Sequence, residues 1–420
     1  MSDATAISAE QMKLVLDVSR RLTVTADLDD LLKHIAHAAT SLLDTERASI
    51  FLHDPQRRQL WTKVALRAGE IRVPDTAGIV GHVFQTGQIV EVPRPYEDAR
   101  FNPEIDRHSG FVTRNLLSAP LKDIDGRTIG VLQALNRRVG GFTSNDWALV
   151  ELLADHAGVA IQRFSLQEQV LRAAGLRHEM ELARNVQMAM IPRQPPEVRN
   201  LRAAGWMRAA SMTGGDCYDL WETADGRLGV LLADASGHGM APALVVSQTR
   251  TLARVLMQMN NEPAQVLLRI NERLANDLEA GRFVTVFLAW IASDGLVNWC
   301  SAGHGPILLR QSASAQFEML KPPGPPIGML PEISFDPLPP IRLQRGGMLV
   351  VMSDGIFEAK SGCGEFMSVQ QIVQVLDESR SAGPAEALSR VQAELKRWQQ
   401  KDEPADDQTF VAVQYLGQSA

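Results

Sequence analysis

Apolar residues change their spacing along this chain, and each change predicts a different kind of structure. Near the N-terminus they recur at helical spacing, first over residues 12–22 and again over residues 28–35. Runs typical of strands follow at 48–53, 60–66, 89–93, 116–121 and 128–135. Asp125-Gly126 predicts a hairpin turn between the last two runs. Helices followed by a mostly antiparallel sheet are typical of an α+β sensor-like domain.

A long helical pattern follows, from about residue 144 to 190. Thr143 or Ser144 is suited to cap its start, and no proline interrupts it before Pro192. Its first half repeats apolar residues every seven positions, at Val150, Ala157, Phe164 and Leu171, with companions at Leu153 and Ala160. This repeat favours a coiled-coil seam between two copies of the chain, with a helix packed on its own domain as the alternative. After Gly175 the apolar spacing changes, which indicates a kink or a switch.

Strand-like and helical runs alternate from about residue 199 to 416. The strands are expected at 228–233, 283–292, 305–309 and 347–352. The helices are expected at 241–259, 263–279, 368–377 and 384–399. Such alternation predicts an α/β layered domain.

Composition excludes several classes without naming a function. The 420 residues, 45% hydrophobic and 22% charged, indicate two or three ordinary globular domains. A net charge of −7 argues against nucleic-acid or membrane partners. The three cysteines lack zinc-finger or disulfide spacing, and no run approaches the roughly 18 apolar residues of a membrane span. We therefore expect a cytoplasmic protein.

Four aspartates stand in short contexts, most of them rich in glycine or turn residues. They are Asp216 in Gly-Gly-Asp, Asp234 in Asp-Ala-Ser-Gly-His-Gly, Asp354 in Ser-Asp-Gly and Asp406 in Asp-Asp-Gln-Thr. Two of them directly follow apolar strand-like runs, which hold a carboxylate rigidly. Hard carboxylate oxygens suit magnesium or manganese. Any one of these motifs is a common turn or solvated charge, but together they suggest a two-metal phosphatase.

The motifs together resemble the metal-dependent protein phosphatase (PPM) family, related to protein phosphatase 2C, in its SpoIIE/RsbU-like branch. The matching runs at 214–219, 234–244, 301–304, 353–359 and 406–409 follow the family's order over about 220 residues. The resemblance implies an α/β/β/α-layered domain with a central β-sandwich. It also implies hydrolysis of a phosphoserine or phosphothreonine protein, typically a STAS-domain anti-sigma-factor antagonist.

The resemblance also implies catalytic and metal-binding roles for these residues. Asp234 would bridge two Mn²⁺ or Mg²⁺ ions and the Ala235 carbonyl would bind one of them, while Asp216 would help hold the second. Asp354 and Asp406 would complete the first. Two such ions acidify water and neutralise phosphoryl oxygens, whereas crowded carboxylates without metal raise each other's pKa. The alternative is a catalytically inactive scaffold that reports a ligand to a partner.

Further residues near these motifs carry weaker signals. The run 181–192, which includes Gln187, resembles a helix that organises the metal site in this branch when a sensor signals. His238 and His304 each lie between glycines and are either turn residues or general acids. Cys217 replaces the branch's usual aromatic residue and is predicted to be a packing position.

The N-terminal segment resembles a GAF domain, and more narrowly the cyclic-nucleotide-binding GAF domains of phosphodiesterases and adenylyl cyclases. The run 98–115 carries the resemblance together with Asn136-Arg137, Phe142 and Asp146, although Trp147 replaces the glutamate that ends this signature. The resemblance implies a pocket for cyclic AMP or cyclic GMP lined by Ser49, Ile79, Val80, Asp106, Ser109, Thr113 and Gln133. A helix that begins near Ile79 would face the cyclic phosphate. A different ligand, or dimerisation without a ligand, stays open.

The expected organisation has four parts. They are an N-terminal helix in 1–23, a GAF sensor domain in 24–163, a linker helix in 144–191 that overlaps it, and a phosphatase domain in 199–416. The expected assembly is a homodimer through the linker helix.

Overall fold

The computed structural model describes the chain except at residues 1–12, 14–26, 63–70, 260–261, 280, 322–323, 379–381, 401–403 and 419–420. The chain divides into two compact units, Met1–Ala174 and Gly175–Ala420. The helix predicted within 1–23 lies outside the described residues, apart from residue 13. In the described part, no helix is long and apolar enough to cross a membrane.

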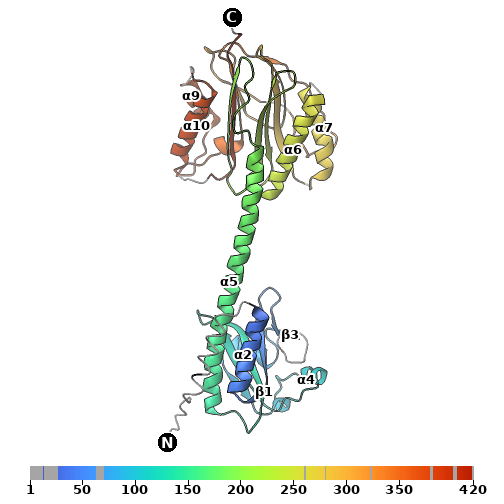
Figure 1. Ribbon diagram of the computed structural model, residues 1–420, viewed down its shortest axis with the longest axis vertical. Coiled ribbons are helices and arrows are strands. Elements are labelled where there is room, and N and C mark those ends of the chain that lie inside the picture. The colour runs from blue at the N-terminus through green and yellow to red at the C-terminus, as the bar shows by residue number, and fades with distance from the viewer. Residues whose placement is uncertain are drawn as a thin grey trace. The chain divides into compact units, whose positions relative to one another are not determined.

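The N-terminal unit is built on one six-stranded antiparallel sheet with the order β3-β2-β1-β6-β5-β4 (Figure 1). Its strands are β1 Thr45–Asp54, β2 Gln59–Thr62, β3 Ile71–Pro74, β4 Val90–Val92, β5 Leu116–Lys122 and β6 Thr128–Arg137. Its helices are α2 Leu28–Leu42, α3 Gly78–Thr86, the short 3₁₀ helix η1 Pro95–Glu97, α4 Pro103–Ser109 and the first part of α5 Ser144–Met190. Each face of the sheet carries its own core, because successive strand residues such as Ile50 and Phe51 point to opposite faces.

The first part of α5 packs on its own sheet, which corrects the predicted coiled-coil seam. Four seam residues are at most 8% exposed within a core shared with α2: Val150, Leu153, Ala157 and Ala160. Gly158 lets the helix approach the sheet, since a Cβ there would lie 2.1 Å from the Lys122 carbonyl oxygen. The heptad spacing is therefore the buried stripe of a domain helix in this region. The exposed apolar residues of α5 are mostly further along, at Leu166, Val170, Leu171, Leu176, Met180, Leu182 and Val186.

The C-terminal unit is a sandwich of two five-stranded sheets with helices on both outer faces (Figure 1). One sheet, ordered β14-β11-β10-β9-β8, is made of β8 Asp216–Glu222, β9 Leu228–Ala235, β10 Val284–Ile291, β11 Leu296–Ala302 and β14 Ile341–Arg342. The other, ordered β13-β12-β15-β16-β7, is made of β7 Leu201–Arg208, β12 Ile307–Arg310, β13 Glu318–Leu320, β15 Met348–Met352 and β16 Gln408–Tyr415.

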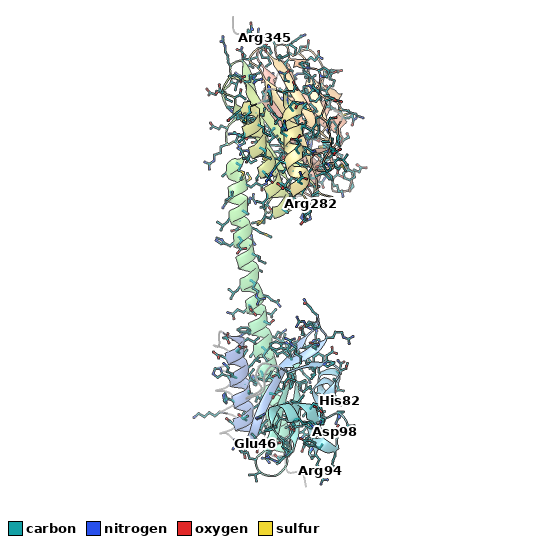
Figure 2. The ribbon with its side chains drawn as sticks, turned by 90° about the vertical axis from the view of Figure 1, so that its right-hand side faces the viewer. Glu46, His82, Arg94, Asp98, Arg282 and Arg345 are labelled. Atoms are coloured by element: carbon teal, nitrogen blue, oxygen red, sulfur yellow. The ribbon has the colours of Figure 1, made fainter. Side chains whose placement is uncertain are left out.

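Helices complete the layers of this unit. They are α6 Met240–Met259 and α7 Pro263–Asp277 on the first sheet, and α8 Asp354–Phe357, α9 Val369–Asp377 and α10 Pro384–Gln399 beside the second. One core fills the space between the sheets and under α6 and α7, and a second lies under α9 and α10. The predicted α+β unit, long helix and α/β/β/α layers are thereby confirmed. Arg282 and Arg345 mark opposite ends of the sandwich (Figure 2).

Candidate metal-binding and ligand-binding sites

Both sheets of the C-terminal unit carry aspartates at the same end of the sandwich. Asp216 begins β8 and pairs directly with Asp234 near the end of β9. Asp354 lies two positions after the end of β15, and Asp406 lies two positions before the start of β16. Because β15 and β16 are antiparallel neighbours, the end of one lies beside the start of the other. The Thr409 hydroxyl donates to Asp216 Oδ2 at 2.6 Å and so joins the two sheets at this point.

The crowding of these carboxyl groups shifts their ionisation. Burial, reinforced by the charges of Asp354 and Asp406, raises the pKa of Asp234 to about 7. Burial and the Asp234 charge raise the pKa of Asp216, and burial and the Asp406 charge raise that of Asp354. The four predicted aspartates therefore form one electrostatic cluster that a divalent cation would stabilise in its ionised form.

Asp407 holds the backbone of the site together, a role that the sequence did not reveal. Its side chain is 6% exposed and accepts a hydrogen bond from the Ala210 N–H at 2.7 Å. The other carboxylate oxygen accepts from the N–H groups of Gly215 and Asp216. The adjacent pair Asp406-Asp407 was the only available signal, because nothing in the sequence shows which of the two is buried.

The glycines of these motifs are required because other parts of the site approach them closely. A Cβ at Gly214 would lie 2.6 Å from Asp407 Oδ2, and one at Gly215 would lie 2.7 Å from the Ala235 carbonyl oxygen. A Cβ at Gly355 would lie 2.1 Å from the Asp407 carbonyl oxygen. Contacts this short do not occur at real Cβ atoms, so a side chain at Gly215 or Gly355 would move the backbone beside the aspartates, and one at Gly214 would displace the Asp407 carboxylate.

Gln187, near the end of α5, contacts this cluster through the backbone of Gly214. Its Nε2 donates to the Gly214 carbonyl at 2.7 Å, and its Oε1 accepts from the Gly214 N–H at 3.1 Å. The Gln187 side chain is 5% exposed, so both bonds are shielded from water. The last turns of α5 therefore fix the backbone two residues before Asp216.

The two histidines and the cysteine occupy different environments. His304 is buried, its Nδ1 lies 2.9 Å from the Thr285 hydroxyl, and burial lowers its pKa to about 4. It is therefore neutral at pH 7 and unsuited to act as a general acid. His238 is exposed on the loop before α6. Burial raises the pKa of Cys217 to about 12, which confirms it as a packing position.

The donors around the cluster are oxygen atoms. Within the described ranges, no three Asp, Glu, His or Cys side chains are arranged to hold one ion. A structural zinc centre requires four such ligands, whereas magnesium keeps several waters and uses one or two carboxylates. The oxygens available are those of the four aspartates and the Ala235 carbonyl. Carboxylate and carbonyl oxygens are the ligands that Mg²⁺ and Mn²⁺ prefer.

The N-terminal unit contains a cavity of about 350 Å³ between the sheet and helices α3 and α4. Six of the seven predicted pocket residues line it: Ser49, Ile79, Val80, Asp106, Thr113 and Gln133. The side chain of the seventh, Ser109, lies outside what the structure describes. The cavity is within the size range of small-molecule sites.

Two features of the cavity wall favour an anion. Arg47 lines it, and α3 begins there with no side chain capping its first N–H groups. Arg100 also lines the cavity, but its guanidinium is paired with Asp98 at 2.7 Å. The oxygens of Asp106 are occupied by protein donors, because Tyr96 and Thr113 donate to them at 2.7–2.9 Å. These bonds also hold α4 against the loop that follows it.

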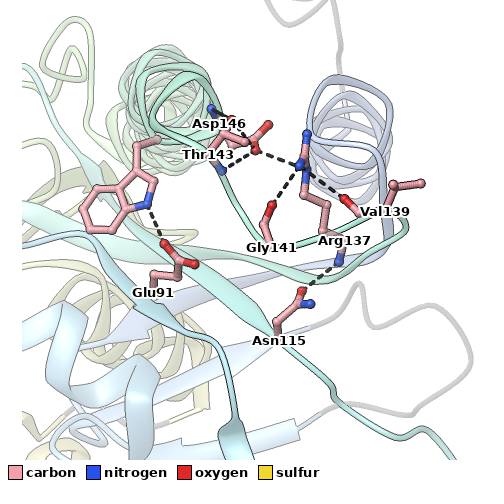
Figure 3. A network of polar contacts seen from close by, with 8 residues as sticks. Glu91, Asn115, Arg137, Val139, Gly141, Thr143 and Asp146 are labelled. Atoms are coloured by element: carbon pink, nitrogen blue, oxygen red, sulfur yellow. Dashed lines mark hydrogen bonds and ion pairs between the residues drawn. The ribbon is translucent and has the colours of Figure 1, made fainter. Parts of the chain in front are cut away.

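The signature residues of the N-terminal unit lie outside this cavity and tie α5 to the sheet (Figure 3). Arg137 Nε lies 3.1 Å from Asp146 Oδ2, and its Nη1 donates to the Gly141 carbonyl at 2.8 Å. The Trp147 indole N–H donates to Glu91 Oε2 at 2.9 Å, so the residue that departs from the signature still makes a contact with β4. These contacts fix the start of α5 relative to the strands that frame the cavity.

Two family models match this chain, one in each of its units. The GAF domain model matches residues 27–161, and the Stage II sporulation protein E (SpoIIE) model matches residues 224–416. The chain is 32% identical over 170 residues to the dual 3',5'-cyclic-AMP and -GMP phosphodiesterase 11A of Takifugu rubripes, covering 37% of this chain and 18% of that protein. It is 23% identical over 242 residues to the phosphoserine phosphatase RsbP of Bacillus subtilis, covering 56% of this chain and 58% of that protein.

A solved structure supports the fold of the C-terminal unit. The SiaA-PP2C domain of Pseudomonas aeruginosa has a TM-score of 0.50 and 18% identity, covering 59% of this chain and 99% of that one. The chain spans less than two thirds of the length of the two curated relatives named above. Residues 27–161 therefore belong to the GAF domain family, and residues 224–416 belong to the SpoIIE branch of the PPM (protein phosphatase 2C-like) family.

Proposed function

We propose that this chain is a metal-dependent protein serine/threonine phosphatase whose activity is controlled through its GAF domain. The observation that carries the proposal is the cluster of four aspartates from remote segments, in which Asp234 has a pKa raised to about 7. When bound, two Mn²⁺ or Mg²⁺ ions supply an acidified water and neutralise the phosphoryl oxygens of the substrate. The expected test result is manganese-dependent hydrolysis of p-nitrophenyl phosphate and of a phosphoserine peptide by the full-length chain.

Different residues of the chain are proposed to bind the metal ions, to position their ligands and to transfer the proton. The four aspartates and the Ala235 carbonyl would hold the ions, as their common position at one end of the sandwich supports. Asp407 and Thr409 keep Asp216 in place by hydrogen bonds. The buried His304 is neutral at pH 7, so we assign proton transfer to the leaving group to solvent or to the exposed His238.

The proposal also covers the substrate of the enzyme and its location in the cell. The similarity to a phosphoserine phosphatase supports a phosphoserine protein, which we propose to be a STAS-domain partner in the cytoplasm. A catalytically inactive scaffold would be expected to have lost one or more of the metal-binding aspartates, and all four are present. Loss of phosphate from a phosphorylated STAS-domain protein, followed by mass spectrometry, tests the substrate class.

Metal removal should make stability depend on pH in a defined direction. An unfolded aspartate titrates near pH 4, whereas Asp234 in the folded metal-free unit titrates at about 7. The folded state therefore binds more protons between these values, and the free energy of unfolding falls as pH rises from about 4 to 7. We expect the metal-free unit to melt at a higher temperature at pH 5.5 than at pH 8, and Mn²⁺ to raise the melting temperature at pH 8.

Thermal melts in chelator and in Mn²⁺ across this pH range measure the effect. Asp234→Asn serves as the control, because it removes the titrating group and should reduce the pH dependence. A metal-free melting temperature that rises from pH 5.5 to 8 would contradict the crowding of the carboxyl groups.

We propose that the GAF cavity binds a cyclic nucleotide, and that α5 conveys this binding to the phosphatase unit. Support comes from the cavity volume, Arg47 and the uncapped start of α3, and from the similarity to a cyclic-nucleotide phosphodiesterase. Dimerisation is proposed through the exposed apolar residues of α5 beyond residue 165. A ligand that binds one arrangement of α5 more tightly than another would shift the population of active enzyme.

Titration with cyclic AMP and cyclic GMP tests this control. At least one of them should change the phosphatase rate, and Thr113→Val should weaken its binding because the hydroxyl that holds Asp106 is lost. Sedimentation of the same samples should give twice the 46.1 kDa mass of one chain. Proven binding without any change in rate would remove the control hypothesis and leave the phosphatase assignment intact.

A further inference from the structure

A second pocket lies beside the aspartate cluster, on the outer face of the sheet that contains β15 and β16. Its volume is about 250 Å³, and β7 and α10 form its two sides. Trp206 and Arg208 come from β7, Lys396 and Gln399 from α10, and Gln408 from the start of β16. None of these residues has been given a role above.

The register of the strands places this pocket close to the catalytic end of the sandwich. Thr409 faces Asp216 between the sheets, so its neighbour Gln408 faces the outer side. Arg208 is paired directly with Gln408. Two residues further on, Ala210 donates to Asp407. At about 3.3 Å per strand residue, Arg208 therefore lies roughly 7 Å along the chain from the loop that holds the aspartates.

The pocket presents positive charge that the protein itself does not neutralise within the described residues. Arg208 and Lys396 are both exposed, and neither is in an ion pair with a described carboxylate. By contrast, the other two basic residues on the exposed part of α10, Arg390 and Arg397, pair with glutamates of the same helix. The pocket floor adds the amide group of Gln399, which is 6% exposed, and that of Gln408, which is 1% exposed and already donates through its Nε2 to the Gly355 carbonyl at 3.0 Å. This combination suits a carboxylate.

We propose that this pocket is a second contact site for the phosphoprotein substrate and takes an acidic side chain two to four residues from the phosphorylated one. The inference rests on the phosphatase function proposed above. An extended segment covers about 3.3 Å per residue, so two residues span the distance from the aspartate loop to Arg208, and the length of the side chains extends the range. Cations beside an acidic centre also offset its repulsion of a negatively charged substrate.

The test uses the full-length chain and two phosphoserine peptides of equal length. One carries glutamates at positions two to four on both sides of the phosphoserine, and the other carries lysines there. We expect kcat/KM to favour the acidic peptide by about tenfold or more at low salt, and this preference to shrink at high salt. The double variant Arg208→Glu/Lys396→Glu should lose or reverse the preference, as should Arg208→Gln/Lys396→Gln to a smaller extent.

Two controls separate the pocket from the catalytic site. Hydrolysis of p-nitrophenyl phosphate should be unchanged in the double variants, because this substrate is too small to reach the pocket. Arg345→Glu, a reversal of one charge at the opposite end of the sandwich (Figure 2), should keep the peptide preference.

An equal peptide preference in wild type and both double variants would overturn the proposal. Added inorganic phosphate provides a further check. If it abolished the peptide preference without affecting p-nitrophenyl phosphate hydrolysis, the pocket would be a site for small anions, and the proposal would be overturned. If no substrate is hydrolysed, the proposed phosphatase function is wrong. Fluorescence anisotropy with the labelled acidic peptide then tests whether the pocket binds acidic side chains. Weaker binding by the double variants supports it, and unchanged binding overturns it.

Discussion

Asp234→Asn is expected to reduce manganese-dependent hydrolysis of p-nitrophenyl phosphate by at least about 1,000-fold. Asp234 lies directly opposite Asp216, and its pKa responds to the charges of Asp354 and Asp406, so it is the centre of the cluster. A bound ion supplies several kcal/mol of transition-state stabilisation, and each 1.4 kcal/mol changes the rate about tenfold. Asp234→Asn replaces the carboxylate by a carboxamide, which removes a charged ligand and keeps the size of the side chain.

A matched substitution distinguishes this loss from a general effect of removing an aspartate. Asp225 lies in the turn between β8 and β9, at the other end of the same two strands, and pairs with Arg227 on the surface. Asp225→Asn should therefore keep nearly full activity, because exposed ion pairs contribute about 0–1 kcal/mol. If Asp234→Asn remained active while folded, the two-metal assignment would be wrong.

Gln187→Ala is expected to lower kcat/KM roughly 10- to 100-fold and to raise the manganese concentration needed for half-maximal activity. The substitution leaves the buried N–H and carbonyl of Gly214 without their partners, which costs about 1–3 kcal/mol. This loss destabilises the backbone next to Asp216, so the Asp216 carboxylate should be held less precisely for metal binding. Manganese titrations of activity, with circular dichroism to confirm folding, measure both effects.

Gln169→Ala is the matched control for this variant. Gln169 is exposed on the same helix, so its truncation should change neither activity nor metal dependence. Activity in Gln187→Ala equal to that of wild type would show that α5 does not position the aspartates. The proposed route from the GAF domain through this helix would then lose its contact with the catalytic end.

For the long helix the predicted limits were correct, but the predicted partner of its first apolar stripe was wrong. The absence of proline and the suitable cap predicted Ser144–Met190, and the structure has the same limits. The sevenfold repeat of Val150 and Ala157 suggested contact with a second chain, but both residues are buried in their own domain. A heptad seam and the inner stripe of an amphipathic helix have nearly the same period, so spacing alone cannot identify what covers the apolar face.

Some residues of the aspartate site could be predicted from local motifs, whereas others depend on partners far away in the sequence. Asp216, Asp234, Asp354 and Asp406 stand in ordered motifs, and a motif identifies ligand types directly from the residues present. Asp407 and Thr409 act through partners more than 190 positions away, namely Gly215 and Asp216. Such partners are set by how the two sheets face each other, which local sequence does not contain.

The sequence by itself determined the helices with strong periodicity, the long apolar strands, and the kinds of side chain available for chemistry. These features depend on neighbours within a few residues, where backbone geometry and side-chain period decide the outcome. Only the tertiary structure decided which face of α5 is buried, that Asp407 rather than a solvent shell holds the site, and that His304 is uncharged. It also decided where Arg208 and Lys396 meet, because distance, burial and charge between remote segments exist only once the sheets have packed.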